Sequence, residues 1–401
     1  MSATVAVAVS GGRDSMALLH CTARAAKAQG IEVVALHVHH GLMADADTWA
    51  EQLEKICARW RVQFAMQRLA GKPGKGESVE AWARRGRYAS LAAMARTAGA
   101  RLVLLAHHRR DQAETFLLQA LRGAGAAGLA AMPVQAEREG IVWARPWLEM
   151  PFEAIAAYAR RHRLKFVEDP SNADPRYARS RLRANVMPAL RQAFAEAEAA
   201  LAAAAAQCAQ AQAVLDEVAQ ADLAAIGEGA SLRLTPWCAL SEARRRNALR
   251  AWLRGQLGRG AAQTLIERLM QELPGTDPAE WPCEGATLHR YCGRLRLVCE
   301  APTGALQSTP VEQGGVALSV LRHAQWRERS GGEQFQRAAG TPPRALKKQF
   351  QAASIPAWQR DAPLLFSADG RLLFVPGLGI DARAVAAPGE AQCALAWVRP
   401  A

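Results

Sequence analysis

The sequence predicts an α/β protein whose first half is a doubly wound, mostly parallel sheet. Apolar, strand-like runs alternate with amphipathic helices through about the first 120 residues, and the first run leads straight into a glycine-rich turn and a helix. Strands that alternate with helices in this way form a parallel sheet, because the crossover helices cover its two faces. The chain of 401 residues is also longer than one typical domain, so further domains are expected after the sheet.

Each expected strand is a short apolar run, and each is followed by an expected helix. Leu53, Ile56 and Cys57, for example, share one face of the second helix. Ligands of such sheets bind in the loops that follow the carboxyl ends of the strands, so functional residues are expected there. The expected strands are Thr4–Val9, Ile31–His39, Val62–Arg68 and Leu102–Ala106, and the expected helices are Asp14–Gln29, Asp47–Trp60, Val79–Ala98 and Asp111–Leu121.

The character of the sequence changes near residue 190. The alanine-rich segment Ala195–Ala213 predicts a long connecting helix. Prolines and glycines in residues 301–315 predict a linker. We therefore expect three domains: the α/β domain over residues 1–190, a helical module over 191–300 and a small mixed α/β domain over 316–401.

Charge and cysteine usage narrow the class of protein. The net charge is +13, and residues 1–190 carry most of the surplus, with 27 Lys and Arg against 17 Asp and Glu. A polyanion is the natural partner of such a chain. The eight cysteines form no Cys-x-x-Cys pair and have no zinc-site spacing, which predicts reduced thiols in a cytoplasmic protein. No stretch is apolar enough to cross a membrane, and the N-terminus lacks the pattern of a secretory signal.

The strongest local signal is the hexapeptide Ser10-Gly11-Gly12-Arg13-Asp14-Ser15, between a strand and a helix. Two glycines let the backbone turn tightly and approach a ligand closely. The helix that follows offers unpaired N–H groups and a partial positive charge, which suit a phosphate. The hexapeptide lacks the Gly-Lys-Ser/Thr of a Walker A loop, so it predicts a phosphate site of another kind.

A second group of candidates follows the fourth strand. Asp111 and Glu114 are three residues apart and share a helix face. Two carboxylates at the end of a parallel strand are suited to Mg²⁺ beside phosphates. His107 lies one helical turn before Asp111 and is a candidate to contact phosphates or move a proton.

Arginines form a third group. Arg84 and Arg87 share the third helix, and residues 160–191 hold nine Lys and Arg with Phe166 and Tyr177 among them. Guanidinium groups bind phosphate or carboxylate in a planar fork, and nearby aromatic rings stack on bases. A solvated basic surface is the alternative interpretation of both groups.

The hexapeptide resembles the PP-motif of the N-type ATP pyrophosphatases, which adenylate an oxygen of a second substrate. Further segments, in the same order along almost the whole chain, resemble the tRNA(Ile)-lysidine synthetases. These segments are His37–Leu42, Glu77–Tyr88, Ala106–Thr115, Arg122–Gly125, Arg145–Leu148, Asp169–Asp174 with Tyr177, Arg181 and Arg183, then Lys347–Gln351 and Ile355–Trp358.

The resemblance implies a nucleotide α-hydrolase-like fold and a specific reaction. ATP adenylates the C2 carbonyl oxygen of the wobble cytidine in a tRNA(Ile) with a CAU anticodon, and the ε-amine of free L-lysine then displaces AMP to give lysidine. It implies that Ser10, Gly11, Gly12, Arg13, Asp14 and Ser15 hold ATP, and that Asp14 and Asp111 support Mg²⁺. Glu114 is expected to meet the lysine ammonium, with His107, Arg84 and Arg87 at the same site. The expected tRNA contacts are Arg122, Arg181, Arg183, Arg244, Arg245, Arg246, Lys347 and Lys348.

Two alternatives remain open at this stage. Another tRNA-modifying adenylating enzyme of the same class, such as a thiolase, often needs paired cysteines, which this chain lacks. A tRNA-binding protein without catalysis has no need of Asp14, Asp111 and Glu114 together. Homodimer formation is consistent with the resemblance, but no residue pattern argues for it.

Overall fold

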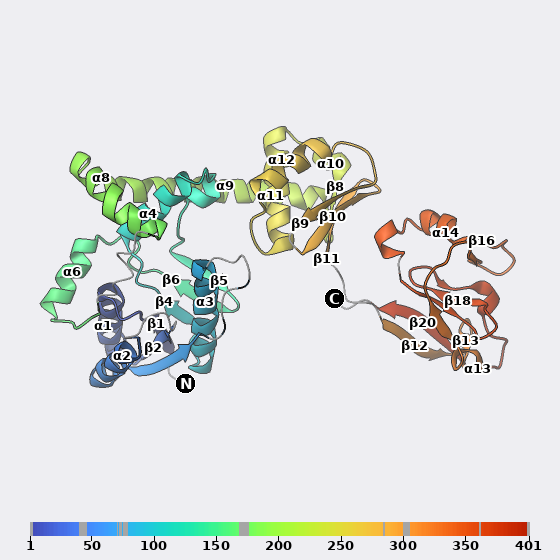
Figure 1. Cartoon of the computed structure of the whole chain (residues 1–401), viewed down its shortest axis with the longest axis horizontal. Helices are drawn as coiled ribbons and strands as arrows, with labels where there is room; N and C mark the ends of the chain where they lie inside the picture. Colours follow the sequence, from blue (N-terminus) through green and yellow to red (C-terminus); the bar gives the residue numbers. More distant parts are fainter. Residues whose placement is uncertain are drawn as a thin grey trace. The chain divides into compact units, whose positions relative to one another are not determined.

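The protein is described by a computed structural model that covers residues 3–39, 46–69, 71, 74, 79–167, 176–283, 285–299, 305–360 and 362–398. The chain divides into two compact units, Met1–Leu215 and Asp216–Ala401 (Figure 1). Parts of the motifs singled out above lie outside the described residues, namely 40–42, 77–78 and 169–174. No helix among the described residues is long and apolar enough to span a membrane.

A six-stranded sheet forms the centre of the first unit, with strand order β3-β2-β1-β4-β6-β5. All neighbours pair in parallel except the edge hairpin of β5 and β6. The four predicted parallel strands are confirmed, whereas the hairpin was not predicted. The bounds are β1 Thr4–Ala8, β2 Glu32–His39, β3 Gln63–Arg68, β4 Leu102–Leu104, β5 Gln135–Arg138 and β6 Ile141–Ala144.

Helices cover both faces of this sheet, as a doubly wound fold requires. On one face Val7 of β1 packs with Leu19 and Cys57 from the first two helices. On the other face Ala6 packs with Leu91 from the third helix. The helices of the unit are α1 Arg13–Ala28, α2 Ala46–Trp60, α3 Val79–Thr97, α4 Arg109–Ala120, α5 Ala126–Leu129, α6 Phe152–Arg161, α7 Ala178–Arg181 and α8 Met187–Ala193, with a π-helical turn at Leu182–Val186.

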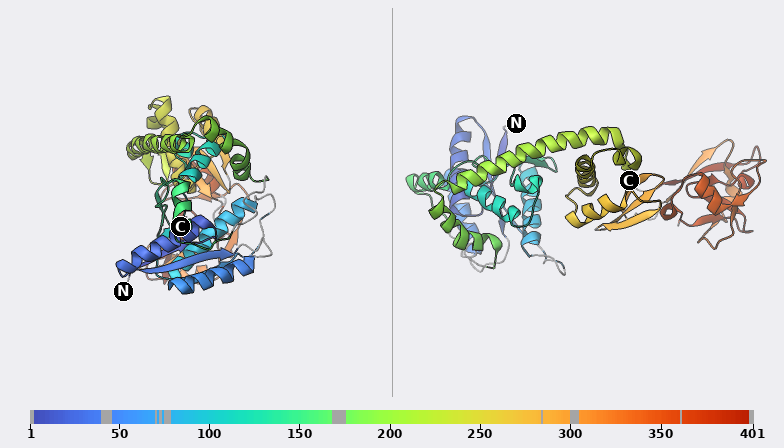
Figure 2. Two further views of the ribbon diagram at one scale, coloured as in Figure 1. Left: turned by 90° about the vertical axis from the view of Figure 1, so that its left-hand side faces the viewer. Right: turned by 90° about the horizontal axis from the view of Figure 1, so that it is seen from above.

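Helix α9, Ala197–Ile226, contains the boundary between the units, and Figure 2 shows it as one continuous helix. Its alanine-rich first half was predicted from helix propensity. The helix is longer than the expected Ala195–Ala213, because Val214, Leu215 and the residues after them continue it to Ile226.

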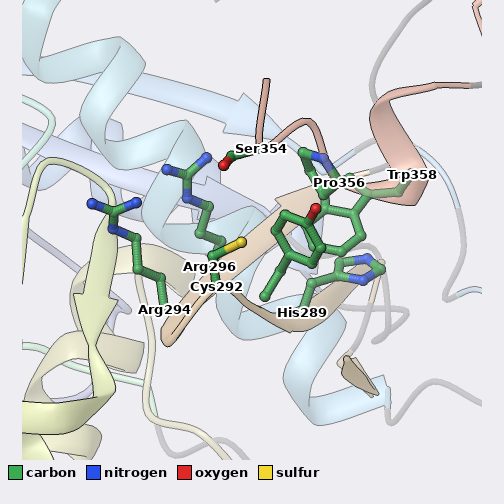
Figure 3. A pocket seen from close by; sticks show the side chains of 8 residues that line it. His289, Cys292, Arg294, Arg296, Ser354, Pro356 and Trp358 are labelled. Atoms are coloured by element: carbon green, nitrogen blue, oxygen red, sulfur yellow. The ribbon is translucent and has the colours of Figure 1, made fainter. Parts of the chain in front are cut away.

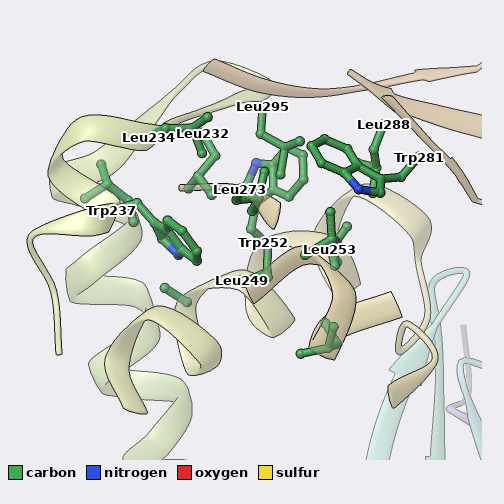
Figure 4. Packing of buried hydrophobic residues seen from close by; sticks show 14 of the residues in the cluster. Leu232, Leu234, Trp237, Leu249, Trp252, Leu253, Leu273, Trp281, Leu288 and Leu295 are labelled. Carbon is green, nitrogen blue, oxygen red and sulfur yellow. The ribbon is translucent and has the colours of Figure 1, made fainter. Parts of the chain in front are cut away.

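The second unit begins with a module that is not purely helical. Three helices pack on a five-stranded antiparallel sheet of order β7-β8-β11-β10-β9, and this sheet corrects the expectation of a helical module. Trp237, Trp252 and Trp281 from both layers lie in one buried cluster (Figure 4). The elements are β7 Gly227–Glu228, β8 Ser231–Arg233, α10 Leu234–Cys238, α11 Glu242–Leu257, α12 Gln263–Glu272, β9 Ala279–Cys283, β10 Ala286–Tyr291 and β11 Arg294–Cys299.

The rest of the unit is a small, mainly β domain. Part of the expected linker 301–315 is strand β12, Ala305–Val311, which pairs along its whole length with β20, Gln392–Val398. This edge strand carries Pro310 and few apolar residues, so its sequence resembles a loop. The other elements are β13 Val316–Ala317, α13 Leu318–Leu321, β14 Gln325–Arg327, β15 Gln334–Phe335, β16 Arg344–Ala345, α14 Leu346–Ala352, β17 Leu364–Phe366, β18 Leu372–Val375 and β19 Gly379–Ile380, with 3₁₀ turns at Ala357–Gln359 and Ala382–Ala384.

Candidate active site

The topology of the first sheet identifies one crevice as the place for a ligand. The chain runs from β1 outward to β2 and β3, and then returns to place β4 on the other side of β1. The loops after β1 and β4 therefore diverge at the carboxyl edge of the sheet, which is where open α/β sheets bind ligands. The glycine-rich hexapeptide follows β1, and the segment from His107 to Asp111 follows β4.

The loop after β1 is prearranged around its two serines. The backbone N–H of Ser10 donates to Ser15 Oγ at 3.2 Å, and Ser15 Oγ donates to the Gly12 carbonyl at 2.9 Å. Gly11 has φ +89°, a conformation that favours glycine. No side chain caps α1 at Gly12, so the first N–H groups of this helix remain open to an anion.

Asp14 and Asp111 converge on one imidazole, that of His108. Its Nε2 lies 3.5 Å from Asp14 Oδ2 and 3.5 Å from Asp111 Oδ2. His108 is the N-cap of α4, and its backbone N–H donates to Asp111 Oδ2 at 3.1 Å. His107 precedes the helix, so it is not one helical turn from Asp111 as expected. Sequence reasoning selected His107 and missed His108, although the capping position three residues before Asp111 was a usable signal.

The site contains titratable groups with shifted pKa values. Burial alone raises the pKa of Asp14, but hydrogen bonds from His108 and Arg13 outweigh it and lower the pKa overall. Burial lowers the pKa of His107, so this imidazole is neutral near pH 7. Its Nδ1 has no hydrogen-bond partner in the described part of the chain.

Arg183 joins the two carboxylates of α4 from a position far along the chain. Its Nε donates to Glu114 Oε1 at 2.6 Å, and its Nη2 donates to Asp111 Oδ1 at 2.9 Å. Arg179 approaches Glu114 Oε2 at 3.4 Å. Glu114 is fully buried, and burial raises its pKa in spite of the Arg183 charge. Both Glu114 oxygens face arginines, but Oε2 has no hydrogen-bond partner among the described residues. Glu114 anchors Arg183, and its contact with the lysine ammonium stays a prediction.

The same pair of aspartates fits a magnesium ion. Mg²⁺ is held by one or two carboxylates together with water and phosphate oxygens. Asp14 and Asp111 supply two such carboxylates beside the open N-terminus of α1. Among the described residues no group of three or more His, Cys, Asp and Glu could hold a metal by itself. Phosphate oxygens and water are therefore needed to complete the coordination.

The remaining predicted residues of the first unit lie around this crevice or on the surface. Arg84 is exposed and lies 5.5 Å from the Tyr88 ring, whereas the charge of Arg87 acts on His107. Arg122 is exposed in the turn after α4, and Arg181, also exposed, donates to the Arg176 carbonyl at 2.9 Å.

The three arginines Arg244, Arg245 and Arg246 of the second unit all contact other side chains of the protein. Arg244 forms an ion pair with Asp222, which is buried, and Arg246 pairs with Glu242 at 2.9 Å. Arg245 lies over the Trp237 ring at 5.6 Å. These contacts weaken the prediction that the triplet binds tRNA phosphates. Lys347 and Lys348, by contrast, lie exposed on α14.

A small pocket in the second unit combines aromatic and basic side chains (Figure 3). His289 stacks on Trp358 with ring centroids 4.0 Å apart. Arg294, which lines the pocket, is paired with Glu228 at 2.9 Å. The cavity has a volume of about 70 Å³, which holds only a few water molecules, so we assign no substrate to it.

Comparison with known proteins agrees with this arrangement of domains. The family model of the PP-loop domain matches residues 1–190, that of the TilS substrate binding domain matches 232–296, and that of the TilS substrate C-terminal domain matches 324–397. The PP-loop match covers both loops of the crevice.

Full-length relatives give the same result. A protein of Ralstonia nicotianae named tRNA(Ile)-lysidine synthase is 42% identical over 96% of this chain and 90% of its own length. Proteins of the same name are 38% identical in Chromobacterium violaceum, over 96% of this chain and 93% of the relative, and 35% identical in Burkholderia mallei, over 94% and 89%. The resemblance deduced from the motifs is thereby confirmed, and this chain belongs to the tRNA(Ile)-lysidine synthase family.

Proposed function

We propose that the protein ligates L-lysine to C2 of the wobble cytidine in a tRNA(Ile) with a CAU anticodon, at the expense of ATP. One observation carries the proposal beyond family membership. Asp14 and Asp111 converge on His108 at the switch point of the sheet, directly beyond an uncapped helix N-terminus. This arrangement suits a nucleoside triphosphate whose phosphates face the two carboxylates.

ATP is the substrate that the loop after β1 serves. The N–H groups of the first turn of α1 and the hydroxyl group of Ser10 supply donors to its phosphates, while Ser15 holds the loop through the Gly12 carbonyl and the Ser10 N–H. A bound Mg²⁺, held by Asp14 and Asp111, would neutralise phosphate charge there. Arg13 keeps Asp14 in place, because its Nε donates to Asp14 Oδ1 at 3.0 Å.

The chemistry proceeds in two displacements. The C2 carbonyl oxygen of cytidine attacks the α-phosphorus, an O–P bond forms, and the bond to the leaving pyrophosphate breaks. The neutral ε-amine of lysine then attacks C2, and the C2–O bond breaks as AMP leaves. Adenylation is needed because the oxygen on C2 is a poor leaving group until it belongs to AMP.

The protein's residues prepare these displacements. Burial lowers the pKa of His107 to about 3, too low for a proton acceptor at neutral pH, so the proton of the attacking amine passes to solvent. Arg183, held by Glu114 and Asp111, faces the same carboxylates and is assigned to position Asp111 rather than to contact RNA. Arg87, Arg122 and Arg181 are assigned to the RNA, as are Lys347 and Lys348 in the second unit. Seven of the eight cysteines are recorded as free thiols, which favours a cytoplasmic location.

An assay with α-labelled ATP tests the proposal. The purified protein receives lysine, tRNA(Ile) transcript with a CAU anticodon, both or neither. We expect labelled AMP only when tRNA is present, and labelled lysine in the tRNA only when all three substrates are present. AMP formation without lysine incorporation identifies a different tRNA-modifying adenylating enzyme. Tight tRNA binding with no AMP at all identifies a binding protein.

Two variants locate the reaction. Asp14→Asn should abolish AMP formation, whereas Glu137→Gln, a matched change at an exposed carboxylate of β5, should leave it unchanged. Equal rates for both variants would place the chemistry elsewhere.

A further inference from the structure

A second cavity lies beside the phosphate loop and is not used by the reaction described above. It has a volume of about 230 Å³ and is walled by α6 and the segment that follows it. The buried, small side chains of Ala156 and Ala159 leave this space open. Three arginines and one aromatic residue are among those that line it, namely Arg13, Arg160, Arg163 and Phe166.

The cavity is joined to the phosphate loop at two points. Arg13 belongs to both, because it lines the cavity while its Nε bonds to Asp14. Phe166 is followed by Val167, whose N–H donates to the Gly11 carbonyl at 2.9 Å. A ligand in the cavity therefore reaches the mouth of the site that holds the phosphates.

Helix α6 forms a fixed wall of the cavity, and arginines lie at the C-terminal end of this helix and just after it. His20 of α1 lies 2.9 Å from the Tyr158 hydroxyl, which fixes α6 against α1. Arg13 lies 4.1 Å from the centre of the Phe152 ring at the start of α6. Among the residues that the structure describes, neither Arg160 nor Arg163 forms an ion pair.

The chemistry of this lining selects the ligand. Arg160 and Arg163 repel the ammonium of free lysine, whereas Arg13 is paired with Asp14, and the triphosphate of ATP is already assigned to the loop. Guanidinium groups together with a half-exposed phenyl ring suit a phosphodiester with its base, the usual combination in proteins that bind single-stranded nucleic acid. Phe166 is 38% exposed and thus open to stacking.

We propose that this cavity, the Arg160 pocket, binds a phosphodiester and the adjoining base of the anticodon loop, and so delivers the wobble cytidine to the phosphate loop. The inference rests on the proposed function in one respect, the identity of the RNA. Pyrophosphate is the other anion formed at this site, so it is the alternative ligand of the pocket.

Salt-dependent binding tests the proposal without requiring turnover. The ligand is a 17-nucleotide anticodon stem-loop RNA, and ATP and lysine are omitted. The double variant Arg160→Gln/Arg163→Gln should flatten the plot of log Kd against log salt by about 0.7, the contribution of one single-stranded phosphate that loses its arginines. Phe166→Ala should weaken binding about ten-fold with an unchanged slope, because it removes stacking and no charge.

The matched control removes two charges from the opposite edge of the sheet. Arg61 and Arg101 precede β3 and β4, and both are exposed. Arg61→Gln/Arg101→Gln changes the net charge equally, and its slope should equal that of the wild type. A pocket variant that behaves like this control overturns the proposal. The proposal is also overturned if the salt slope for RNA is unchanged in the pocket variant while pyrophosphate inhibits its AMP formation less than that of the wild type. That result would assign the pocket to pyrophosphate.

The outcome is separable from the fate of the proposed function. If the pocket variant loses salt dependence but the wild type never incorporates lysine, the pocket stands and the proposed reaction fails. If the wild type incorporates lysine and the slope is unchanged in the variant, the reaction stands and the pocket fails.

Discussion

Replacement of Arg183 by methionine tests how the carboxylates of the site are kept in place. Arg183 is the only group in the described part of the chain that bonds to both Glu114, at 2.6 Å, and Asp111, at 2.9 Å. Methionine keeps much of the length of the side chain and removes its charge. Removal of one partner from a buried ion pair costs about 3–5 kcal/mol. Because the Arg183 side chain is 38% exposed and Arg179 still faces Glu114, we expect about 2 kcal/mol.

Thermal and urea unfolding of the full chain measure this cost. For a unit of this size, 2 kcal/mol corresponds to a fall in Tm of roughly 4–8 °C. The loss should depend on pH, because burial already raises the pKa of Glu114 and removal of Arg183 raises it further. At pH 8 the folded variant must either hold an ionised Glu114 or protonate it at a cost in free energy. As the pH falls through the raised pKa toward the ordinary value of a glutamate, the folded state takes up the proton and the difference from the wild type shrinks.

A second substitution separates charge from packing. Glu114→Gln removes the charge that Arg183→Met leaves unpaired, so the double variant should be more stable at pH 8 than Arg183→Met alone by about 1 kcal/mol. A loss that is equal at pH 5 and pH 8, or a double variant no more stable than the single one, refutes the electrostatic reasoning and assigns Arg183 to packing.

Three other predictions concern separate parts of the molecule. Asp111→Ala should reduce AMP formation at least about 100-fold. It should also lower the free energy of unfolding by about 1 kcal/mol, because Asp111 accepts the His108 N–H at the start of α4; the rate of AMP formation and the Tm are both measured. Arg244→Gln should lower the Tm of the second unit and change tRNA affinity less than about two-fold in a filter-binding assay, because its partner is the buried Asp222. The wild type should lose stability as the pH falls below about 6.5, because His107 binds a proton only when unfolded. In urea titrations, His107→Asn should reduce the slope of the free energy of unfolding against pH by up to about 1.4 kcal/mol per pH unit.

Local patterns predicted the elements of the first unit more completely than those of the second. The strands β1 to β4 are signalled by apolar runs, and the helices between them by their periodicity. Strand β6 is the apolar run Ile141–Ala144, one residue longer than β4, which was predicted, so its own sequence gives no reason for its omission. In the antiparallel sheet of the second unit, Pro282 stands inside β9 and weakens the strand signal there.

The candidate site shows the same limit in its side chains. Asp14 and Asp111 were predicted because each follows a strand in a recognisable motif. The contact between Glu114 and Arg183 joins residues 69 positions apart, and no local pattern encodes it. Sequence reasoning therefore predicted Glu114 at the substrate but not the arginines that lie beside it in the structure.

Basic residues show most clearly what spacing alone leaves undetermined. Arg244 to Arg246 form the densest arginine run in the chain, yet two of the three are neutralised by acids at positions 222 and 242. Arg160 and Arg163 form a less conspicuous pair, and within the described chain no acid pairs with either of them. An arginine that is paired with an acid of the protein binds a polyanion less readily, because the existing ion pair must be broken first. The surplus of the first 190 residues is therefore better evidence for an RNA site than any single run, and the Arg160 pocket holds part of that surplus beside the phosphate loop.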